Sequence, residues 1–336
     1  MVEITKIKLD KVDRKILTEL DKNCRIPSSR LAKIVRKSRQ TVEYRIDQLT
    51  KKGIITSFNT AINPHKMGHK IYKIYLELKN IPEIKEKLFS ELRSSEMVYW
   101  MGEFSGKWDL IFAIFAKTDQ EFFELKNKII SEYNNIIISE EGGTLLDVKQ
   151  YPKMYLTNEI SKPTAFGGEI IDTKLDELDH NLLEILVNNA RISVVDLAKQ
   201  VGSTPIIVKN RMKKLEVSGV IIQYRIGIDI NTLGLDLYKV IIKLDRYTKK
   251  DQAKLSEYLS RIPNIHYFIR NLWQIEPELV VETYKEFYLI IENLKKEFPG
   301  VIRSVDSLLM VSDEWTPGFK NLIKKKNQAT QPEPIE

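Results

Sequence analysis

The chain is poor in the residues that build disulfides and metal clusters. Its 336 residues include one cysteine, Cys24, which excludes an internal disulfide and a cysteine-based zinc cluster. His65 and His69 stand four apart in a segment without nearby cysteines or acids, so we interpret both as polar surface residues. The glycine-rich motifs of P-loops and of dinucleotide-binding folds are absent. We therefore predict neither a metal site nor a cofactor.

Long apolar runs are absent as well. No apolar run approaches the ~18–20 residues that a membrane helix needs, so we predict no membrane partner. The first ten residues, M-V-E-I-T-K-I-K-L-D, contain no uninterrupted apolar stretch and no small-residue cleavage site, so we expect a cytoplasmic protein.

The chain contains a gap-free internal repeat. Residues 9–78 recur at residues 175–244, a constant offset of 166 (175 − 9), and most core positions exchange one apolar residue for another. The two copies are called here the first and the second repeat. Cys24 corresponds to Ala190, which indicates that Cys24 is a small buried residue.

Positive charge is concentrated at the start of the chain. Residues 1–62 hold 15 Lys/Arg against 7 Asp/Glu, a balance of +8, whereas residues 172–230 hold 8 against 8. The whole chain carries +7, so the excess lies in the first block. A block this basic favours a polyanionic partner, and nucleic acid is the leading candidate.

Each repeat begins with three helical patterns. A first helix, a short second helix and a third helix are predicted in each, and a tight turn of three residues joins the second to the third. In the first repeat a small hairpin over residues 54–63 follows. This order is typical of a winged helix-turn-helix. The predicted caps and stops are Asp10, Ser28 or Ser29, Ser38 and Gly53 in the first repeat, and Asp176, Thr204 and Gly219 in the second.

After each helix-turn-helix the period changes to strand–helix–strand–strand–helix–strand. The fold class is therefore α+β, with two repeats that each hold a winged helix-turn-helix and a ferredoxin-like βαββαβ domain. Such a sheet leaves one face uncovered, and an apolar uncovered face packs on another sheet. The aromatic residues at strand spacing fit this role better than base stacking: Tyr72, Tyr75, Tyr99, Trp100, Phe112 and Phe115.

Domain boundaries follow from these patterns. The helix-turn-helix units are placed at 1–62 and 175–230, the ferredoxin-like domains at 63–156 and 231–319, a flexible linker at 157–174 and a disordered tail at 320–336.

The helix-turn-helix residues resemble those of the Lrp/AsnC family of bacterial and archaeal transcription regulators. The likeness rests on L-D-x-x-D-x-x-I-L from Leu9, on L-A-x-x-V-G-S-T-P-x-x-V-x-x-R-M from Leu197 with its counterpart from Leu31, and on G-K-W-D from Gly106. It covers residues 9–156 closely and 175–312 less closely. The resemblance implies that the helix-turn-helix binds double-stranded DNA and that the sheet domains mediate self-association.

The resemblance also implies a small effector, often an amino acid, at the Gly-x-x-Asp turn. This points to Gly106 and Asp109 as effector-binding residues; the alternative is that Gly106 permits a tight turn and Asp109 satisfies it. In the second repeat Asn271 and Gln274 take these places and Pro277 is expected to interrupt the next strand, so no effector site is expected there.

The third helix of the first repeat supplies the predicted DNA contacts, because a recognition helix reaches base edges from its start and flanking cations neutralise phosphates. At the preceding turn Gly202 suits a left-handed conformation, whereas Arg36 is strained there. Arg45, which recurs as Arg211, is open to two roles: a phosphate contact, or pairing with a nearby acid. The candidates are Arg36, Lys37, Ser38, Arg39, Gln40, Tyr44, Arg45, Lys51 and Lys52, with Lys209, Asn210, Arg211 and Lys213 as weaker ones.

Three functions compete. The favoured one is a sequence-specific DNA-binding regulator, not an enzyme, whose repeats form an intramolecular pseudo-dimer. The second is an enzyme resembling fused siroheme decarboxylases, for which only H-Y-F-I-R from His266 to Arg270 is suggestive. The third is an interaction scaffold without DNA contact. The neutral second helix-turn-helix leaves DNA contact and interaction equally open for that unit.

Overall fold

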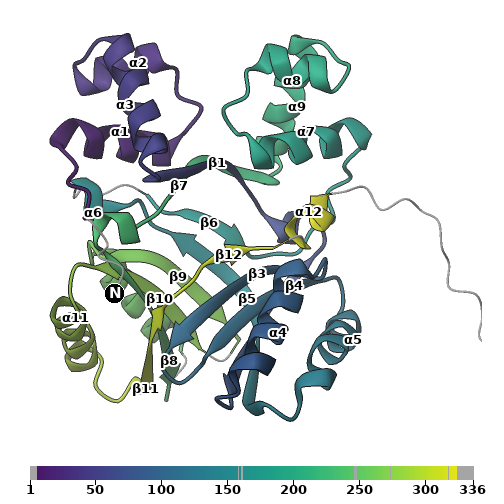
Figure 1. The fold of residues 1–336 in the computed structure, drawn as a ribbon, viewed down its shortest axis with the longest axis vertical. Helices are drawn as coiled ribbons and strands as arrows, with labels where there is room; N and C mark the ends of the chain where they lie inside the picture. Colours follow the sequence, from purple (N-terminus) through teal and green to yellow (C-terminus); the bar gives the residue numbers. More distant parts are fainter. Residues whose placement is uncertain are drawn as a thin grey trace, which may run out of the picture.

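The computed structural model describes residues 6–157, 159, 162–245, 248–272, 274–316 and 318–323. Two helix-turn-helix units lie side by side above a body of strands (Figure 1). The unit of the first repeat consists of α1 (Lys11–Lys22), α2 (Ser28–Val35), α3 (Arg39–Lys51) and β1 (Ile55–Ile62). The unit of the second repeat consists of α7 (Glu177–Asn188), α8 (Val194–Gln200), α9 (Pro205–Val217) and β7 (Ile221–Ile228).

The polar caps predicted for the helix-turn-helix units are present in all but one case. The side chain of Asp10 accepts a hydrogen bond from the Asp13 N–H at 2.8 Å, and that of Ser38 accepts one from the Thr41 N–H at 3.1 Å. Asp176 and Thr204 cap the equivalent helices of the second repeat. The exception is α2, which begins after Pro27 without a side-chain cap in the described structure.

The predicted hairpin of the first repeat is wrong. Residues 55–62 form one strand, β1, which pairs antiparallel with β7 of the second repeat, so that Phe58 lies opposite Ile226 and Thr60 opposite Tyr224. A two-residue hairpin turn usually needs two residues that accept positive φ, most often Asn-Gly, and this segment has Asn59 but no glycine. The backbone groups of β1 are instead satisfied by the equivalent strand of the other repeat.

The two βαββαβ domains are confirmed. The first consists of β2 (Lys70–Leu78), α4 (Pro82–Ser94), β3 (Val98–Ser105), β4 (Leu110–Ala116), α5 (Asp119–Ile130) and β5 (Ile137–Gln150). The second consists of β8 (Asp236–Leu244), α10 (Lys249–Ser260), β9 (Ile265–Asn271), β10 (Ile275–Val281), α11 (Tyr284–Glu297) and β11 (Ile302–Met310). The strand orders are β5-β2-β4-β3 and β11-β8-β10-β9.

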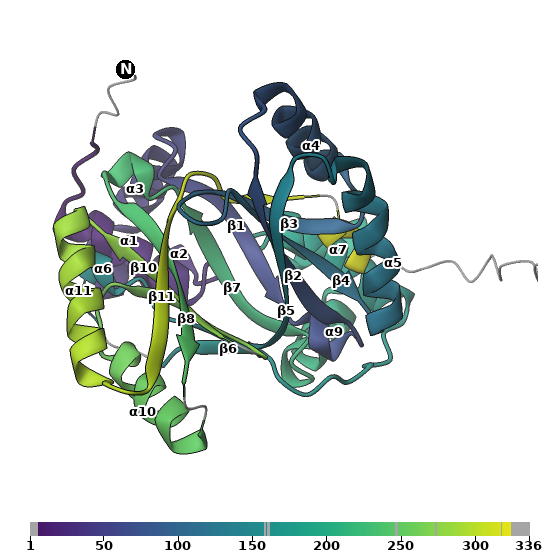
Figure 2. The same cartoon turned by 90° about the horizontal axis from the view of Figure 1, so that it is seen from below.

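The two sheets join at both edges. Strand β5 pairs with β9, and β11 pairs with β3 at Leu309–Ser105 and Met310–Phe104, so eight strands form a closed, barrel-like sandwich. Figure 2 shows α10 and α11 on one side of the strands and α4 and α5 on the other. The uncovered faces therefore meet inside, where aromatic residues such as Tyr75 and Tyr99 are buried as predicted.

The interior of the sandwich also holds charge. Lys73 and Lys239, equivalent residues of the two repeats, are 4% and 0% exposed. Both ammonium groups contact the Glu276 carboxylate, at 2.9 and 3.2 Å, and Lys239 also contacts Glu278 at 2.5 Å. The Tyr75 hydroxyl and the Asn271 amide donate to Glu276. We call Lys73, Lys239, Glu276, Glu278 and Tyr75 the interior ion cluster.

The segment predicted as a flexible linker contains a strand, because β6 (Thr164–Gly167) pairs with β5. The short elements are η1 (Pro64–Lys66), η2 (Ser131–Tyr133), α6 (Met154–Thr157), η3 (Asn231–Leu233), β12 (Glu314–Trp315) and α12 (Gly318–Ile323). The predicted disordered tail begins inside α12, and residues 324–336 lie outside the described residues.

The interior ion cluster makes stability depend on acid pH. Burial alone would raise the pKa of Glu276, but the Lys73 and Lys239 ammonium groups outweigh it and hold the pKa at about 2. A carboxyl with a depressed folded-state pKa stabilises the fold above its ordinary pKa of 4.5 and loses that contribution as pH falls towards 2. Glu276→Gln should therefore lower the free energy of unfolding at pH 7 by about 3–5 kcal/mol and flatten the acid loss, measured by denaturant unfolding at several pH values.

The control is Glu257→Gln, which removes an exposed pair with Arg261 and should change stability by less than about 0.5 kcal/mol. Equal stability of Glu276→Gln and wild type at pH 7 would contradict the role of the cluster.

Candidate nucleic-acid interface

The turn between α2 and α3 holds the chain in a left-handed conformation. Arg36 has φ 54° and ψ 47°, and no other non-glycine residue among those described has a positive φ. Gly202 occupies the equivalent position with φ 63°. A left-handed L-residue costs roughly 1–2 kcal/mol, so the predicted strain at Arg36 is present. The turn directs Lys37 and Ser38 into the start of α3.

The predicted DNA contacts of the first repeat lie on this turn and along α3. The exposed members are Arg36, Lys37, Ser38, Arg39, Gln40, Tyr44, Lys51 and Lys52. Two of the cations make exposed pairs within the helix: Arg39 with Glu43 and Lys51 with Asp47, both at 2.8 Å. The Arg39 guanidinium lowers the pKa of Glu43. Such exposed pairs contribute little net stability, so a phosphate can replace the acid.

Arg45 and Arg211 pair with acids, which decides the alternative that the sequence left open. Arg45 contacts Asp10 at 2.6 Å and Asp13 at 2.8 Å. Arg211 contacts Asp176 at 2.5 Å and also approaches the buried Asp179. The hydrogen bond that Arg45 donates to the Asp10 carboxylate raises the pKa of Arg45. The charge of Arg45 therefore holds α3 against the start of α1. We therefore omit both arginines from the proposed DNA contacts.

The second helix-turn-helix presents a different surface. Lys209, Asn210 and Lys213 are exposed on α9, so the weaker candidates are accessible. The start of this helix, however, exposes Ile206, which is 74% accessible, where the first repeat has Gln40. The surface at the second helix start is therefore apolar rather than hydrogen-bonding.

The two helix-turn-helix units share one hydrophobic core, which includes Leu17 and Val42 of the first repeat and Leu183 and Val208 of the second. The Thr60 hydroxyl donates to the Leu186 carbonyl at 2.7 Å, and Arg225 on β7 contacts Asp21 on α1 at 3.1 Å. Each unit thus packs on the strand of the other repeat, and their spacing is fixed by covalent and tertiary structure. Sequence periodicity within one repeat could not reveal this exchange.

The effector candidates both have structural partners. The Asp109 carboxylate accepts hydrogen bonds from the Leu78 N–H at 2.8 Å and from Lys85 at 2.9 Å. Gly106 has φ 151°, and a Cβ there would lie 2.6 Å from Leu308 Cδ2 and 2.9 Å from the Ser307 carbonyl. The glycine is needed because β11 of the second repeat passes close by. Effector binding at this turn stays a prediction.

In the second repeat, the residues equivalent to Gly106 and Asp109 form hydrogen bonds with Glu276 of the interior ion cluster. Asn271 and Gln274 are buried and both donate to Glu276. Pro277 does not interrupt the strand as predicted: β10 runs through it and pairs it with Phe268 of β9. Sequence reasoning missed the cluster, although the identity of Lys73 and Lys239 at core positions was a usable signal.

The structure corrects the interpretation of His65 and agrees with that of Cys24. His65 is buried, not a surface residue, and its Nδ1 lies 2.9 Å from the Gly168 carbonyl oxygen. Burial lowers the pKa of this histidine. Cys24 is buried as predicted. Within the described residues no cluster of potential metal ligands occurs, and no helix there has the length and apolar character to cross a membrane.

Comparisons with known proteins agree on the helix-turn-helix. The family model for a winged helix-turn-helix DNA-binding domain matches residues 9–56, and that for an AsnC-type helix-turn-helix domain matches residues 175–216. An uncharacterised HTH-type transcriptional regulator of Pyrococcus horikoshii is 30% identical over 146 residues, covering 44% of this chain and 96% of the relative. One from Pyrococcus abyssi is 33% identical over 156 residues, 45% of this chain and 86% of the relative.

A solved structure matches both repeats together. The siroheme decarboxylase NirDL superposes with a TM-score of 0.64, covering 94% of this chain and 97% of that chain at 12% identity. At this identity the likeness concerns the fold alone: the paired arrangement of two helix-turn-helix and two ferredoxin-like domains.

The strained turn gives a prediction on stability. Arg36→Gly relieves the left-handed strain but gains conformational freedom in the unfolded chain, so it should raise the free energy of unfolding by about 0.5–1 kcal/mol. The reciprocal Gly202→Arg should lower it by a similar amount, since open space surrounds Gly202 and only the backbone conformation is affected. Denaturant unfolding measures both, and a destabilised Arg36→Gly would contradict the assignment of strain.

Proposed function

The chain belongs to the Lrp/AsnC family of DNA-binding transcription regulators, and from this premise we propose that it binds specific double-stranded sequences mainly through its first helix-turn-helix. The observation that carries the proposal is the exposed polar and cationic surface of the Arg36 turn and α3. Gln40 and Tyr44 lie in the first two turns of α3, from which a recognition helix reads base edges. Lys37 and Lys52 flank them and would neutralise phosphates.

The second repeat contributes less to DNA binding in this proposal. Lys209, Asn210 and Lys213 are accessible, but Lys214 is bound to the buried Asp179 at 3.0 Å. Ile206 is exposed at the helix start. Apolar side chains can contact thymine methyl groups but supply no hydrogen bonds to the other base edges. The neutral charge of residues 172–230 agrees with this weaker role.

The two repeats act as an intramolecular pseudo-dimer in this proposal. What supports it is the β1–β7 pairing and the shared core beneath both helix-turn-helix units. Both sheet edges pair within the chain. Self-association of whole chains through the ferredoxin-like domains would therefore use their outer surface, where α11 exposes Tyr284, Tyr288 and Leu289.

A small effector such as an amino acid remains part of the proposal. A ligand at the turn of Gly106 and Asp109 would touch both repeats, because β11 lies against that turn. Its ammonium group would have to displace Lys85 from Asp109. The residues from His266 to Arg270 do not support the alternative of a siroheme decarboxylase. The His266 Nδ1 atom is buried and Arg270 is bound to Asp147, so neither offers a free cationic group to a tetrapyrrole.

The test compares two variants that each remove two positive charges. Lys37→Ala with Lys52→Ala should weaken duplex binding at least about 10-fold at low salt and reduce the slope of log Kd against log salt by about 2, because two phosphate contacts are lost. Lys209→Ala with Lys213→Ala is the matched control and should change Kd by less than about threefold. Fluorescence anisotropy of a labelled duplex measures both.

Equal losses in the two variants would contradict the unequal roles of the repeats. A wild-type chain that binds no duplex at low salt would refute DNA binding altogether.

A further inference from the structure

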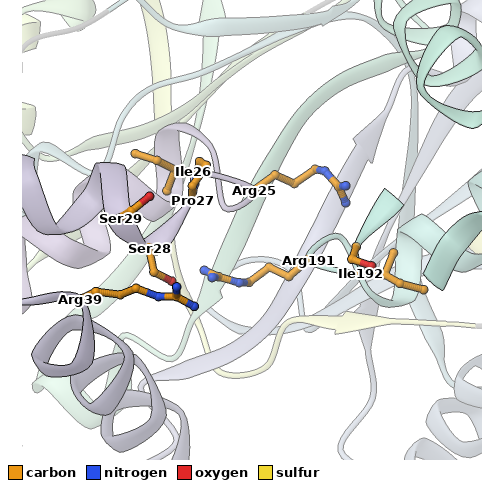
Figure 3. Close-up of a pocket in the computed structure, with 9 residues that line it drawn as sticks. Arg25, Ile26, Pro27, Ser28, Ser29, Arg39, Arg191 and Ile192 are labelled. Carbon is orange, nitrogen blue, oxygen red and sulfur yellow. The ribbon is translucent and has the colours of Figure 1, made fainter. Parts of the chain in front are cut away.

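A pocket of about 390 Å³ lies between the two helix-turn-helix units, at the start of α2 (Figure 3). Three arginines and three serines line it together with apolar residues, and no acid is among the described residues in its wall. The polar lining residues are Arg25, Ser28, Ser29, Arg39, Arg191 and Ser193. Both repeats contribute, so the pocket exists only because they pair.

Arg191 crosses from the second repeat towards the first. Figure 3 shows its guanidinium beside that of Arg39 and close to Ser28. Its Cζ lies 5.3 Å from the centre of the Phe58 ring, and its Nη1 is buried without a hydrogen-bond partner. Burial lowers the pKa of Arg191. A buried donor without an acceptor is costly, and an anion in the pocket would supply one.

The internal repeat provides a comparison within the molecule. Arg25, the equivalent of Arg191, crosses the other way: it lies 5.4 Å from the Tyr224 ring, the equivalent of Phe58, and donates to the Ala190 carbonyl. On that side the residues equivalent to Ser28, Ser29 and Arg39 are Val194, Val195 and Pro205. Arg191 therefore meets serines and an arginine in the first repeat, whereas Arg25 meets valines and a proline at the equivalent positions of the second.

Two further features favour an anion. Helix α2 begins after Pro27 without a side-chain cap, so its first N–H groups and the positive end of its dipole face the pocket region. One acid, Glu43, lies against this cluster: it is exposed, it pairs with Arg39 at 2.8 Å, and Arg39, Ser28 and Arg191 together lower its pKa. Since an exposed ion pair contributes little net stability, a ligand anion can displace Glu43.

We propose that this pocket binds a phosphate group, held by Arg191 of the second repeat and by Arg39, Ser28 and the start of α2 of the first. The planar fork of a guanidinium matches two oxygens of a phosphate. If the phosphate belongs to the DNA backbone, the second repeat supplies a contact to the DNA site of the first, and this version rests on the proposed function. If it is a free anion, the pocket is a ligand site between the two helix-turn-helix units.

The first experiment uses inorganic phosphate and the full chain. Calorimetric titration and thermal melting are done at constant ionic strength, with chloride as the replaced anion. Wild type should bind phosphate, and Arg191→Gln should weaken that binding about 10-fold or more, because one charge-assisted bidentate contact is lost. Arg191→Lys should fall between them, since it keeps the charge without the fork.

Arg25→Gln is the matched control. It removes the same residue type from the equivalent loop and the equivalent ring contact, so it reports any general loss of stability. It should weaken phosphate binding clearly less than Arg191→Gln does, because Arg25 lines the same pocket but its guanidinium is bound to the Ala190 carbonyl and points away from Arg39 and Ser28. Equal weakening in Arg25→Gln and Arg191→Gln, or no phosphate binding to wild type, overturns the proposal.

The second experiment identifies the source of the phosphate. Duplex binding is measured against salt for wild type and Arg191→Gln. A slope reduced by about 1 in the variant identifies a DNA phosphate. An unchanged slope, with inorganic phosphate binding lost, identifies a free anion. If wild type binds no duplex while phosphate binding still depends on Arg191, the pocket stands and the proposed DNA function fails.

Discussion

The ion cluster inside the strand sandwich determines how the two repeats pair. Lys73 stands opposite Ala113 across β2 and β4, so its own repeat offers it no acid there, whereas Lys239 stands opposite Glu278 across β8 and β10. Lys73 reaches Glu276 only because the second sheet lies against the first. An unpaired ammonium in this interior would cost several kcal/mol. Two first repeats brought together would combine two lysines and no acid, so the charges select the second repeat as partner.

Once the sheets are paired, the positions of the helix-turn-helix units follow. The β5–β9 contact and the shorter β3–β11 contact, which joins Leu309 to Ser105 and Met310 to Phe104, hold the two sheets together at both edges. Above it, β1 and β7 pair with each other, and each helix-turn-helix packs on both strands. The distance between the two recognition helices is therefore set by rigid elements rather than by a tether, and β6 ties even the connecting segment to the body.

Much of this architecture could be predicted from the sequence, because it depends on local signals. The caps at Asp10 and Ser38, the left-handed turn at Arg36 and the strand–helix order each follow from residues close in sequence. The exchange of β1 and β7 could not be predicted, since a strand's partner is not encoded in its own period. For the same reason the roles of Arg45 and His65 stayed open or were misjudged: each is decided by residues that only tertiary structure brings near.

The internal repeat makes departures from symmetry interpretable, because the partner copy shows what the scaffold needs. Asp10, Arg45 and their equivalents Asp176 and Arg211 form the same contact twice, which identifies a structural pair. Where the copies differ, the difference has a chemical meaning. The acids in the sheet interior come from the second repeat, whereas the cations of the turn before the recognition helix, Arg36 and Lys37, come from the first and are replaced by Gly202 and Ser203 in the second. The second repeat thus neutralises Lys73 in the interior of the first sheet and fixes the position of the first repeat. The first repeat, supported in this way, can keep an excess of positive charge at its surface for an anionic partner.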